Sequence, residues 1–149
     1  MKTKITALLL FVSVVFSACV STFDQFTFDE TKATKVQMES LMNKATTPYS
    51  DNLSDINALK TQMQNMLTYE RNKQNNTINR KMWELITREG STINDFFKTW
   101  ESQGTMSQPF IDEFKPQINE IFDLMIDYES KKDKQAENAL RQILSAATN

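Results

Sequence analysis

Residues 53–66 read LSDINALKTQMQNM, and their apolar side chains recur every three or four positions. Leu53, Ile56, Leu59, Met63 and Met66 follow spacings of three, three, four and three. This pattern places all five on one side of an α-helix and is typical of a seam between packed helices. The segment therefore predicts a helix that buries one face and exposes the other.

The composition extends this expectation to the whole chain. Only two glycines and three prolines occur among 149 residues, and both residue types interrupt helix interiors. No segment alternates apolar and polar residues long enough to predict a strand. We expect an all-α fold, an elongated up-down bundle of three to four helices, two of them long.

Helix boundaries follow from caps and periodicity. The first helix is expected over residues 29–45, with Ala33, Val36, Leu41 and Met42 on its buried side. The seam helix is expected to start near residue 51 and to continue to a C-cap at Gly90. The alternative is a break near Asn75-Asn76, because residues 70–77 contain no apolar side chain.

Two further helices are expected in the second half. Ser91 or Thr92 would cap a short helix that Gly104 closes. The last helix would start near Pro109 and run into residues 136–144, with Pro116 either kinking it or marking a later start. Residues 131–134 (KKDK) are expected to be solvated. The first and third helices together would then cover the length of the second, with the fourth alongside.

The composition also excludes several classes of function. The chain has no histidine and one cysteine, so it lacks the usual proton shuttle, the commonest transition-metal ligand and any Ser-His or Cys-His pair. Two isolated glycines cannot form a phosphate-binding loop. We therefore expect no enzyme, no cofactor and no metal site.

The N-terminal residues read MKTKITALLLFVSVVFSAC. Lys2 and Lys4 form a positive segment. A predominantly apolar stretch of twelve residues, Ile5 to Phe16, follows, and Ser17 and Ala18 then precede Cys19. This order is typical of an export signal, and the apolar run is shorter than the roughly 20 residues that span a bilayer.

Phe16, Ser17, Ala18 and Cys19 resemble the lipobox of bacterial lipoproteins, with Phe16 in the place usually held by leucine. The resemblance covers residues 1–19 only. It implies a diacylglyceryl thioether on Cys19, cleavage between Ala18 and Cys19, and an acyl chain such as palmitate on the new amino group. Several acyl chains give stable membrane anchoring.

The predicted organisation is a signal peptide over residues 1–18, a lipidated tether over residues 19–28 and one helical-bundle domain over residues 29–149. Val20 and Ser21 follow the cysteine with no aspartate, which resembles the pattern of lipoproteins sorted to the outer membrane, facing the periplasm. After removal of the leader, 15 basic and 19 acidic residues give a charge of −4, which disfavours nucleic acid as a partner.

The tether carries Phe23, Phe26 and Phe28. Two interpretations remain: the rings pack on the first helix or the bundle end, or they lie in the lipid interface beside the acyl chains. The first is favoured because the segment has no basic residue to attract anionic lipid.

Aromatic residues concentrate in the middle of the chain. At helical spacing they are expected to be core; the functional alternative is a partner or ligand surface where the short third helix meets its neighbours. The residues of this candidate surface are Trp83, Phe96, Phe97, Trp100, Phe110 and Phe114.

Acidic residues offer one weaker pattern. Glu120, Asp123 and Asp127 share a helix face and have the oxygen ligands that Ca²⁺ takes, but a solvated face is favoured because such charge patterning is common.

We interpret the chain as a lipid-anchored cell-envelope protein that acts as a protein-binding or scaffolding module. The sequence is compatible with a homodimer as well as with a monomer. The alternative is a bundle that binds or senses a small ligand through its aromatic-rich end.

Overall fold

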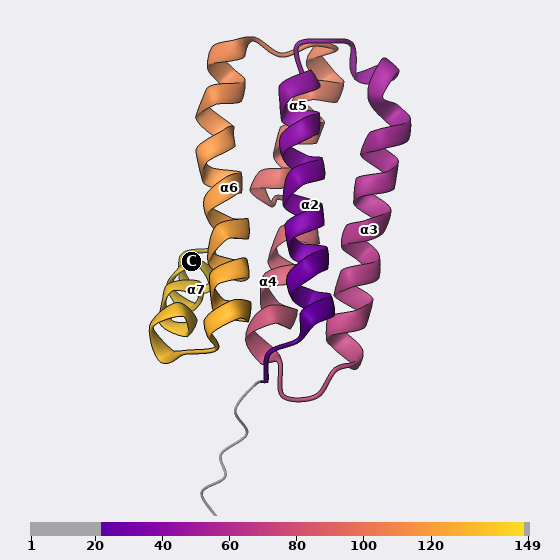
Figure 1. The fold of residues 1–149 in the computed structure, drawn as a ribbon. Coiled ribbons are helices and arrows are strands. Elements are labelled where there is room, and N and C mark those ends of the chain that lie inside the picture. Colours follow the sequence, from indigo (N-terminus) through magenta and orange to yellow (C-terminus); the bar gives the residue numbers. More distant parts are fainter. Residues whose placement is uncertain (1–21, 148–149) are drawn as a thin grey trace, which may run out of the picture.

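The computed structural model describes residues 22–147, which fold into helices without a strand (Figure 1). This confirms the predicted all-α class. In chain order the elements are α2 (Gln25–Lys44), the 3₁₀ helix η1 (Tyr49–Asn52), α3 (Leu53–Asn72), α4 (Thr77–Thr87), α5 (Thr92–Gln103), α6 (Gln108–Lys131) and α7 (Lys134–Ala146).

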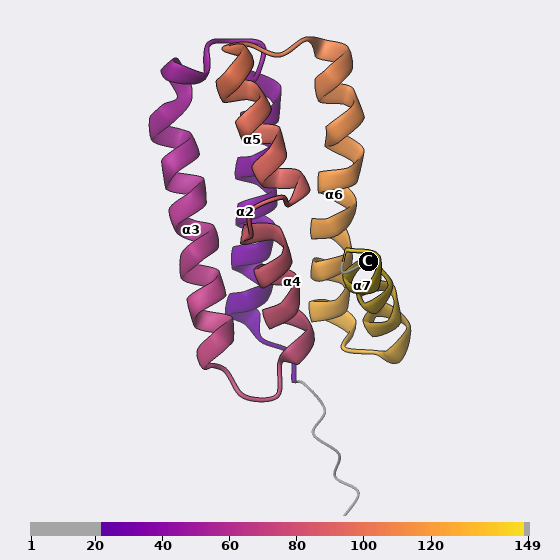
Figure 2. The ribbon, with the colours of Figure 1, turned by 180° about the vertical axis from the view of Figure 1, so that it is seen from behind.

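The helices form a bundle in which α2, α3 and α6 lie side by side, and α4 and α5 follow one another along a fourth column (Figures 1 and 2). Helix α2 packs against both α3 and α6, α4 packs against α3, and α5 packs against α6. Helix α7 folds back from the end of α6 and contacts α6 and α4. The sequence pattern predicted α4 joined to α3 and α7 joined to α6. In the structure, α4 helps to form the fourth column and α7 packs outside α6 and α4.

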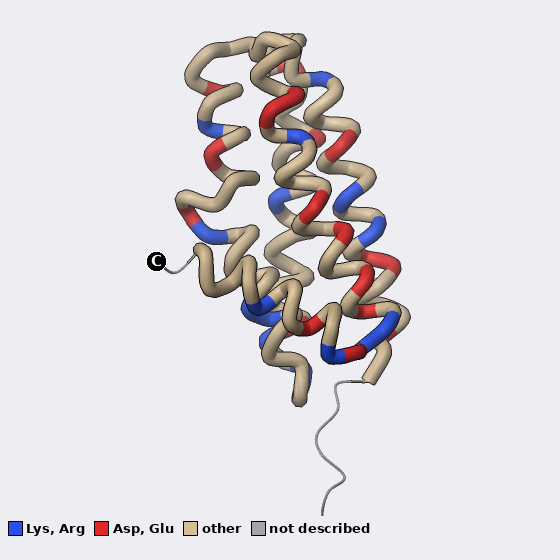
Figure 3. The backbone as a smooth tube through the Cα atoms, turned by 90° about the vertical axis from the view of Figure 1, so that its left-hand side faces the viewer, with Lys and Arg blue, Asp and Glu red and all other residues tan. Residues whose placement is uncertain are grey.

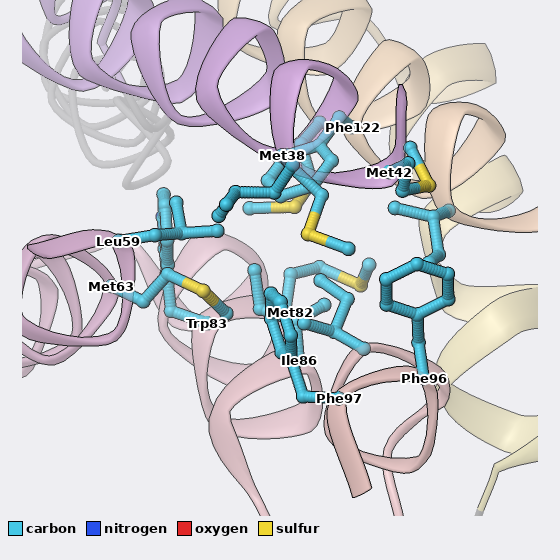
Figure 4. Close-up of a cluster of buried hydrophobic side chains, with 14 of the residues drawn as sticks. Met38, Met42, Leu59, Met63, Met82, Trp83, Ile86, Phe96, Phe97 and Phe122 are labelled. Carbon is cyan, nitrogen blue, oxygen red and sulfur yellow. The ribbon is translucent and has the colours of Figure 1, made fainter. Parts of the chain in front are cut away.

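The core combines methionine and aromatic side chains from all four columns, and they point toward one another in Figure 4. Flexible thioethers fill irregular gaps between rigid rings, which suits a column that breaks in the middle. The side chains labelled in that view are Met38, Met42, Leu59, Met63, Met82, Trp83, Ile86, Phe96, Phe97 and Phe122.

The first helix begins earlier than predicted, and its buried side differs. Asp24 caps it, because its carboxylate accepts the backbone N–H groups of Phe26 and Thr27. The tether predicted over residues 19–28 therefore ends sooner, since residues 25–28 are helical. The expected stripe was half right: Leu41 and Met42 are buried, but Ala33 is exposed and Val36 is 64% exposed. The buried residues of α2 are Thr27, Thr31, Thr34, Met38, Leu41 and Met42.

The seam helix stops at Asn72, so its predicted continuation to Gly90 was wrong and the alternative break was correct. Asn75 turns the chain with a positive φ of 57°, which asparagine tolerates better than most residues. Four of the five seam residues of α3 are buried as predicted, and Leu53 is 44% exposed.

The last predicted helix is also two helices. Lys132 adopts the left-handed conformation with φ 49°, which ends α6 and reverses the chain into α7. Residues 131–134 are not uniformly solvated, because the Lys132 side chain is 8% exposed and pairs with Glu129. Helix α6 begins at Gln108 and continues through Pro116, so a later start is excluded.

The short helix α5 matches its prediction closely. The Ser91 hydroxyl accepts the backbone N–H of Asn94 as an N-cap, and Gly104 follows the last turn with φ 77°. Both signals are local, so the sequence alone sufficed to place them.

Candidate functional site

Two glutamates lie fully buried at the end of the bundle where α2 begins. Glu70 comes from the last turn of α3 and Glu129 from the last turn of α6, and each is 0% exposed. A buried carboxylate is costly unless it is paired and hydrogen-bonded. Each therefore needs partners that the rest of the fold must supply.

Glu129 holds three separate parts of the chain together. Its Oε1 accepts the backbone N–H of Asp24 at 2.7 Å, and its Oε2 accepts the Lys132 ammonium at 2.6 Å and the Asn79 side-chain amide. These donors lie just before α2, just after α6 and in α4. Glu129 thus ties the entry of the bundle to the α6–α7 turn.

Glu70 is held mainly by neutral groups. The Thr27 hydroxyl donates to it at 2.5 Å, and the Asn76 side chain donates to both its carboxylate and its backbone carbonyl. Burial raises the pKa of Glu70, and the nearby negative charge of Glu129 adds to that rise, while the Thr27 and Asn76 hydrogen bonds oppose it.

Asp24 extends the cluster toward the surface. Its Oδ2 accepts the Tyr69 hydroxyl at 2.7 Å and lies 2.6 Å from the Lys73 ammonium. Burial raises the pKa of Asp24, but the hydrogen bonds with Lys73, Tyr69 and Thr27 outweigh it and lower the pKa to about 2. The same contact raises the pKa of Tyr69 to about 12, because the ionised Asp24 carboxylate accepts a hydrogen bond from the Tyr69 hydroxyl and would repel a phenolate.

The arrangement is a clamp that ties separate chain segments together. Its carboxylates are occupied by donors from four elements, and among residues 22–147 no group of three or more His, Cys, Asp or Glu side chains is placed to hold a metal ion. Sequence reasoning missed the cluster because Glu70, Asn76 and Asn79 lie in or beside a polar run that resembles a solvated loop. The one available signal was the recurrence of Thr27, Thr31 and Thr34 at helical spacing.

A second feature is a groove between α4 and α7. One part has a volume of about 450 Å³ and an apolar floor of Leu85 and Leu144. The cationic side chains of Lys81, Arg88 and Arg141 line it. Arg88 also donates to the carbonyl of Ala147 at 2.8 Å, which joins α4 to the end of α7.

The groove continues from α4 and α7 toward α5 and α6. A hollow of about 400 Å³ shares Leu85 and Arg88 with the first and adds the apolar side chains of Ile121 and Ile143. The combined groove, called the α4–α7 groove below, therefore has a basic part and an apolar part. Glu84 is its one acidic lining residue, and it pairs with Arg71 at 3.2 Å.

The aromatic residues lie in the core, as the favoured interpretation predicted, and the four fully buried rings do not form the alternative surface. Trp83, Phe96 and Trp100 are 0% exposed and Phe97 is 2% exposed, while Phe110 and Phe114 are half-buried against the core. The rings pack on one another: Phe96 meets Trp100 edge-on at 6.2 Å between centroids, and Trp100 donates its indole N–H to Thr47. A small bundle needs its largest side chains inside, which explains why these rings form the core.

The acidic residues that the sequence singled out on α6 are not among the bonded residues of the buried cluster or the lining of the groove. Asp123 pairs with Lys35 and Asp127 with Lys131 at 2.7 Å, and Glu120 is exposed. Their neighbours are thus lysines, as on an ordinary charged helix face.

The predicted cleavage and lipidation residues Ala18 and Cys19 lie outside the described residues. No helix within residues 22–147 combines the length and the apolar character needed to cross a bilayer. No protein family, curated protein or solved structure matches this chain.

Proposed function

We propose that this chain is a lipid-anchored protein of the bacterial cell envelope that binds a protein partner in the α4–α7 groove. The observation that carries the proposal is the combination of an apolar floor at Leu85 and Leu144 with a cationic lining at Lys81, Arg88 and Arg141. Such a groove suits an amphipathic segment with acidic side chains, which would bury its apolar face and approach the cations.

The groove fits a macromolecular partner better than a small metabolite. Its two parts run along neighbouring helices and are open to solvent, whereas small-molecule sites usually enclose most of their ligand. The aromatic end, the basis of the ligand-sensing alternative, is closed by ring packing of Phe96 and Trp100. That alternative therefore has no structural observation in its favour.

The anchor is proposed on the resemblance of residues 16–19 to a lipobox. The mature chain would begin at Cys19, carry acyl chains there, and sit in the outer membrane facing the periplasm. The test is intact-mass spectrometry of the membrane fraction. We expect a mass of cleavage before Cys19 plus acyl chains, which Cys19→Ala abolishes; an unmodified or soluble wild-type chain would refute the anchor.

The partner site is tested by photo-crosslinking in living cells. A photoreactive residue at Leu85 should give a discrete adduct, and Arg141→Glu should remove it by reversing the local charge. The control position is Asn57, an exposed residue of α3 that does not line the α4–α7 groove. Adducts of equal strength from both positions, or an adduct that survives Arg141→Glu, would contradict this site.

A further inference from the structure

Exposed apolar side chains are unevenly distributed over the bundle. Among residues 22–147, five large apolar side chains are exposed, and three of them lie at the end where α2 begins. Phe23 is 49% exposed, Phe26 is 48% exposed and Tyr69 is 37% exposed. The Phe26 and Tyr69 rings touch, with centroids 4.7 Å apart, so these residues form one surface, the aromatic end patch.

The chain leaves the bundle inside this patch, and its exit is fixed. The backbone N–H of Asp24 donates to buried Glu129, and the Asp24 carboxylate accepts the Tyr69 hydroxyl. The chain before Asp24 therefore starts beside the patch. It could move away only if the hydrogen bonds of Asp24 with Glu129 and Tyr69 were broken.

The distance to the proposed anchor is short. Four residues lie between Cys19 and Asp24, and the five Cα–Cα steps of an extended chain cover at most roughly 18 Å. The 24 residues of α6 span about 36 Å of bundle by comparison. Acyl chains on Cys19 would consequently lie close to the aromatic end patch and far from the opposite end.

The charges at this end are largely compensated. Figure 3 shows basic and acidic residues alternating near the start of α2, in the turn between α6 and α7. Lys73 pairs with Asp24, Lys131 with Asp127, and Lys134 with Glu137. The patch therefore needs no anionic lipid. Tyrosine is enriched at membrane–water interfaces, and phenylalanine is common on the apolar face of helices that lie in such interfaces.

We propose that Phe23, Phe26 and Tyr69 insert into the headgroup region of the membrane that holds Cys19, so that the bundle is docked on the bilayer by the aromatic end patch. This inference rests on the proposed lipidation of Cys19. Docking holds the α4–α7 groove at a set distance from the membrane instead of letting it swing on a flexible tether.

The test is spin-label accessibility in the full lipidated protein, reconstituted into phosphatidylcholine vesicles. Cys19 is the only cysteine and its thiol would be consumed by the lipid, so an introduced cysteine is the one reactive thiol. Gln25→Cys places a label beside the patch without removing it, and Ser54→Cys places one in the first turn of α3, at the other end of the bundle.

Reconstitution should reduce the collision of the label at position 25 with a water-soluble nickel chelate and raise its collision with oxygen, and should leave position 54 unchanged. Phe23→Ser with Phe26→Ser should abolish this protection while the protein still floats with the vesicles. The matched control, Val36→Ser with Leu53→Ser, removes two exposed apolar side chains elsewhere and should leave the protection intact.

The outcomes distinguish a failure of the membrane docking from a failure of the proposed lipidation of Cys19. Equal accessibility at positions 25 and 54 in protein that carries acyl chains and floats would overturn the docking while leaving the anchor. Protein that lacks acyl chains or fails to float would overturn the anchor and the docking together. Protection that appears only with anionic lipid would also overturn the inference, because the mechanism would then be electrostatic.

Discussion

Replacing Glu129 with glutamine tests the clamp most directly. The carboxylate is 0% exposed and accepts from Asp24, Asn79 and Lys132. In Glu129→Gln, the Lys132 ammonium, itself 8% exposed, loses its anion. A hydrogen bond to a charged group contributes about 1.5–3 kcal/mol, and breaking a buried ion pair costs about 3–5 kcal/mol. We expect a loss of about 3 kcal/mol in the free energy of unfolding.

The measurement is urea unfolding of residues 20–149, followed by circular dichroism and by the fluorescence of buried Trp83 and Trp100. For a domain of this size the same loss lowers the melting temperature by roughly 10 °C. Glu137→Gln is the matched control, because Glu137 is also a carboxylate paired with cations, here Lys134 and Arg141, but it lies at the surface. It should cost less than about 1 kcal/mol.

A double variant separates lost charge from lost packing. Glu129→Gln with Lys132→Gln removes both charges, so it should be more stable than the sum of the single changes by at least about 1 kcal/mol. The reasoning would be refuted if Glu129→Gln cost no more than Glu137→Gln, or if the two changes at positions 129 and 132 were additive.

Three further predictions concern pH and backbone conformation. The lowered pKa of Asp24 contributes stability above its ordinary value of 3.8 that is lost as pH falls toward about 2; Asp24→Asn should therefore be less stable at pH 7 and unfold with a shallower acid dependence between pH 4 and 2. The raised pKa of Glu70 acts in the opposite direction, because its contribution is present at low pH and lost as pH rises through the folded-state pKa; the stability of Glu70→Gln relative to wild type should increase between pH 4 and 8 in urea titrations, and a constant difference would contradict this. Gly104→Ala should cost about 1 kcal/mol through its positive φ alone, since an added Cβ meets no atom within 4 Å; a larger loss by thermal unfolding would show that the turn is held by packing instead.

Local signals predicted the elements that depend on local chemistry. The seam of α3 was predicted from five apolar positions, four of which are buried, and α5 from the Ser91 cap and Gly104. Each of these features involves residues within one turn of one another, so the chain carries the information without its tertiary partners.

The two helix breaks, one given only as the alternative and one missed, have a different origin. Glu70 and Asn76 look like solvated residues in sequence, yet both are buried. They bond to each other, and Glu70 also accepts the hydroxyl of Thr27, 43 residues away. Lys132 likewise reads as one member of a charged run and becomes the partner of buried Glu129. Periodicity cannot reveal a polar residue that is buried by a partner from another helix.

The sequence by itself determined that residues 22–147 are helical and which α3 face is buried, because periodicity and the scarcity of glycine and proline act locally. It also carries the lipobox-like residues 16–19, on which the proposed anchor rests. Only the tertiary structure decided that the aromatic residues close into a core, that α4 and α7 form a basic groove, and that Asp24 is clamped beside Phe26 and Tyr69. These features depend on contacts between residues far apart in the chain, and packing and buried charge select them together.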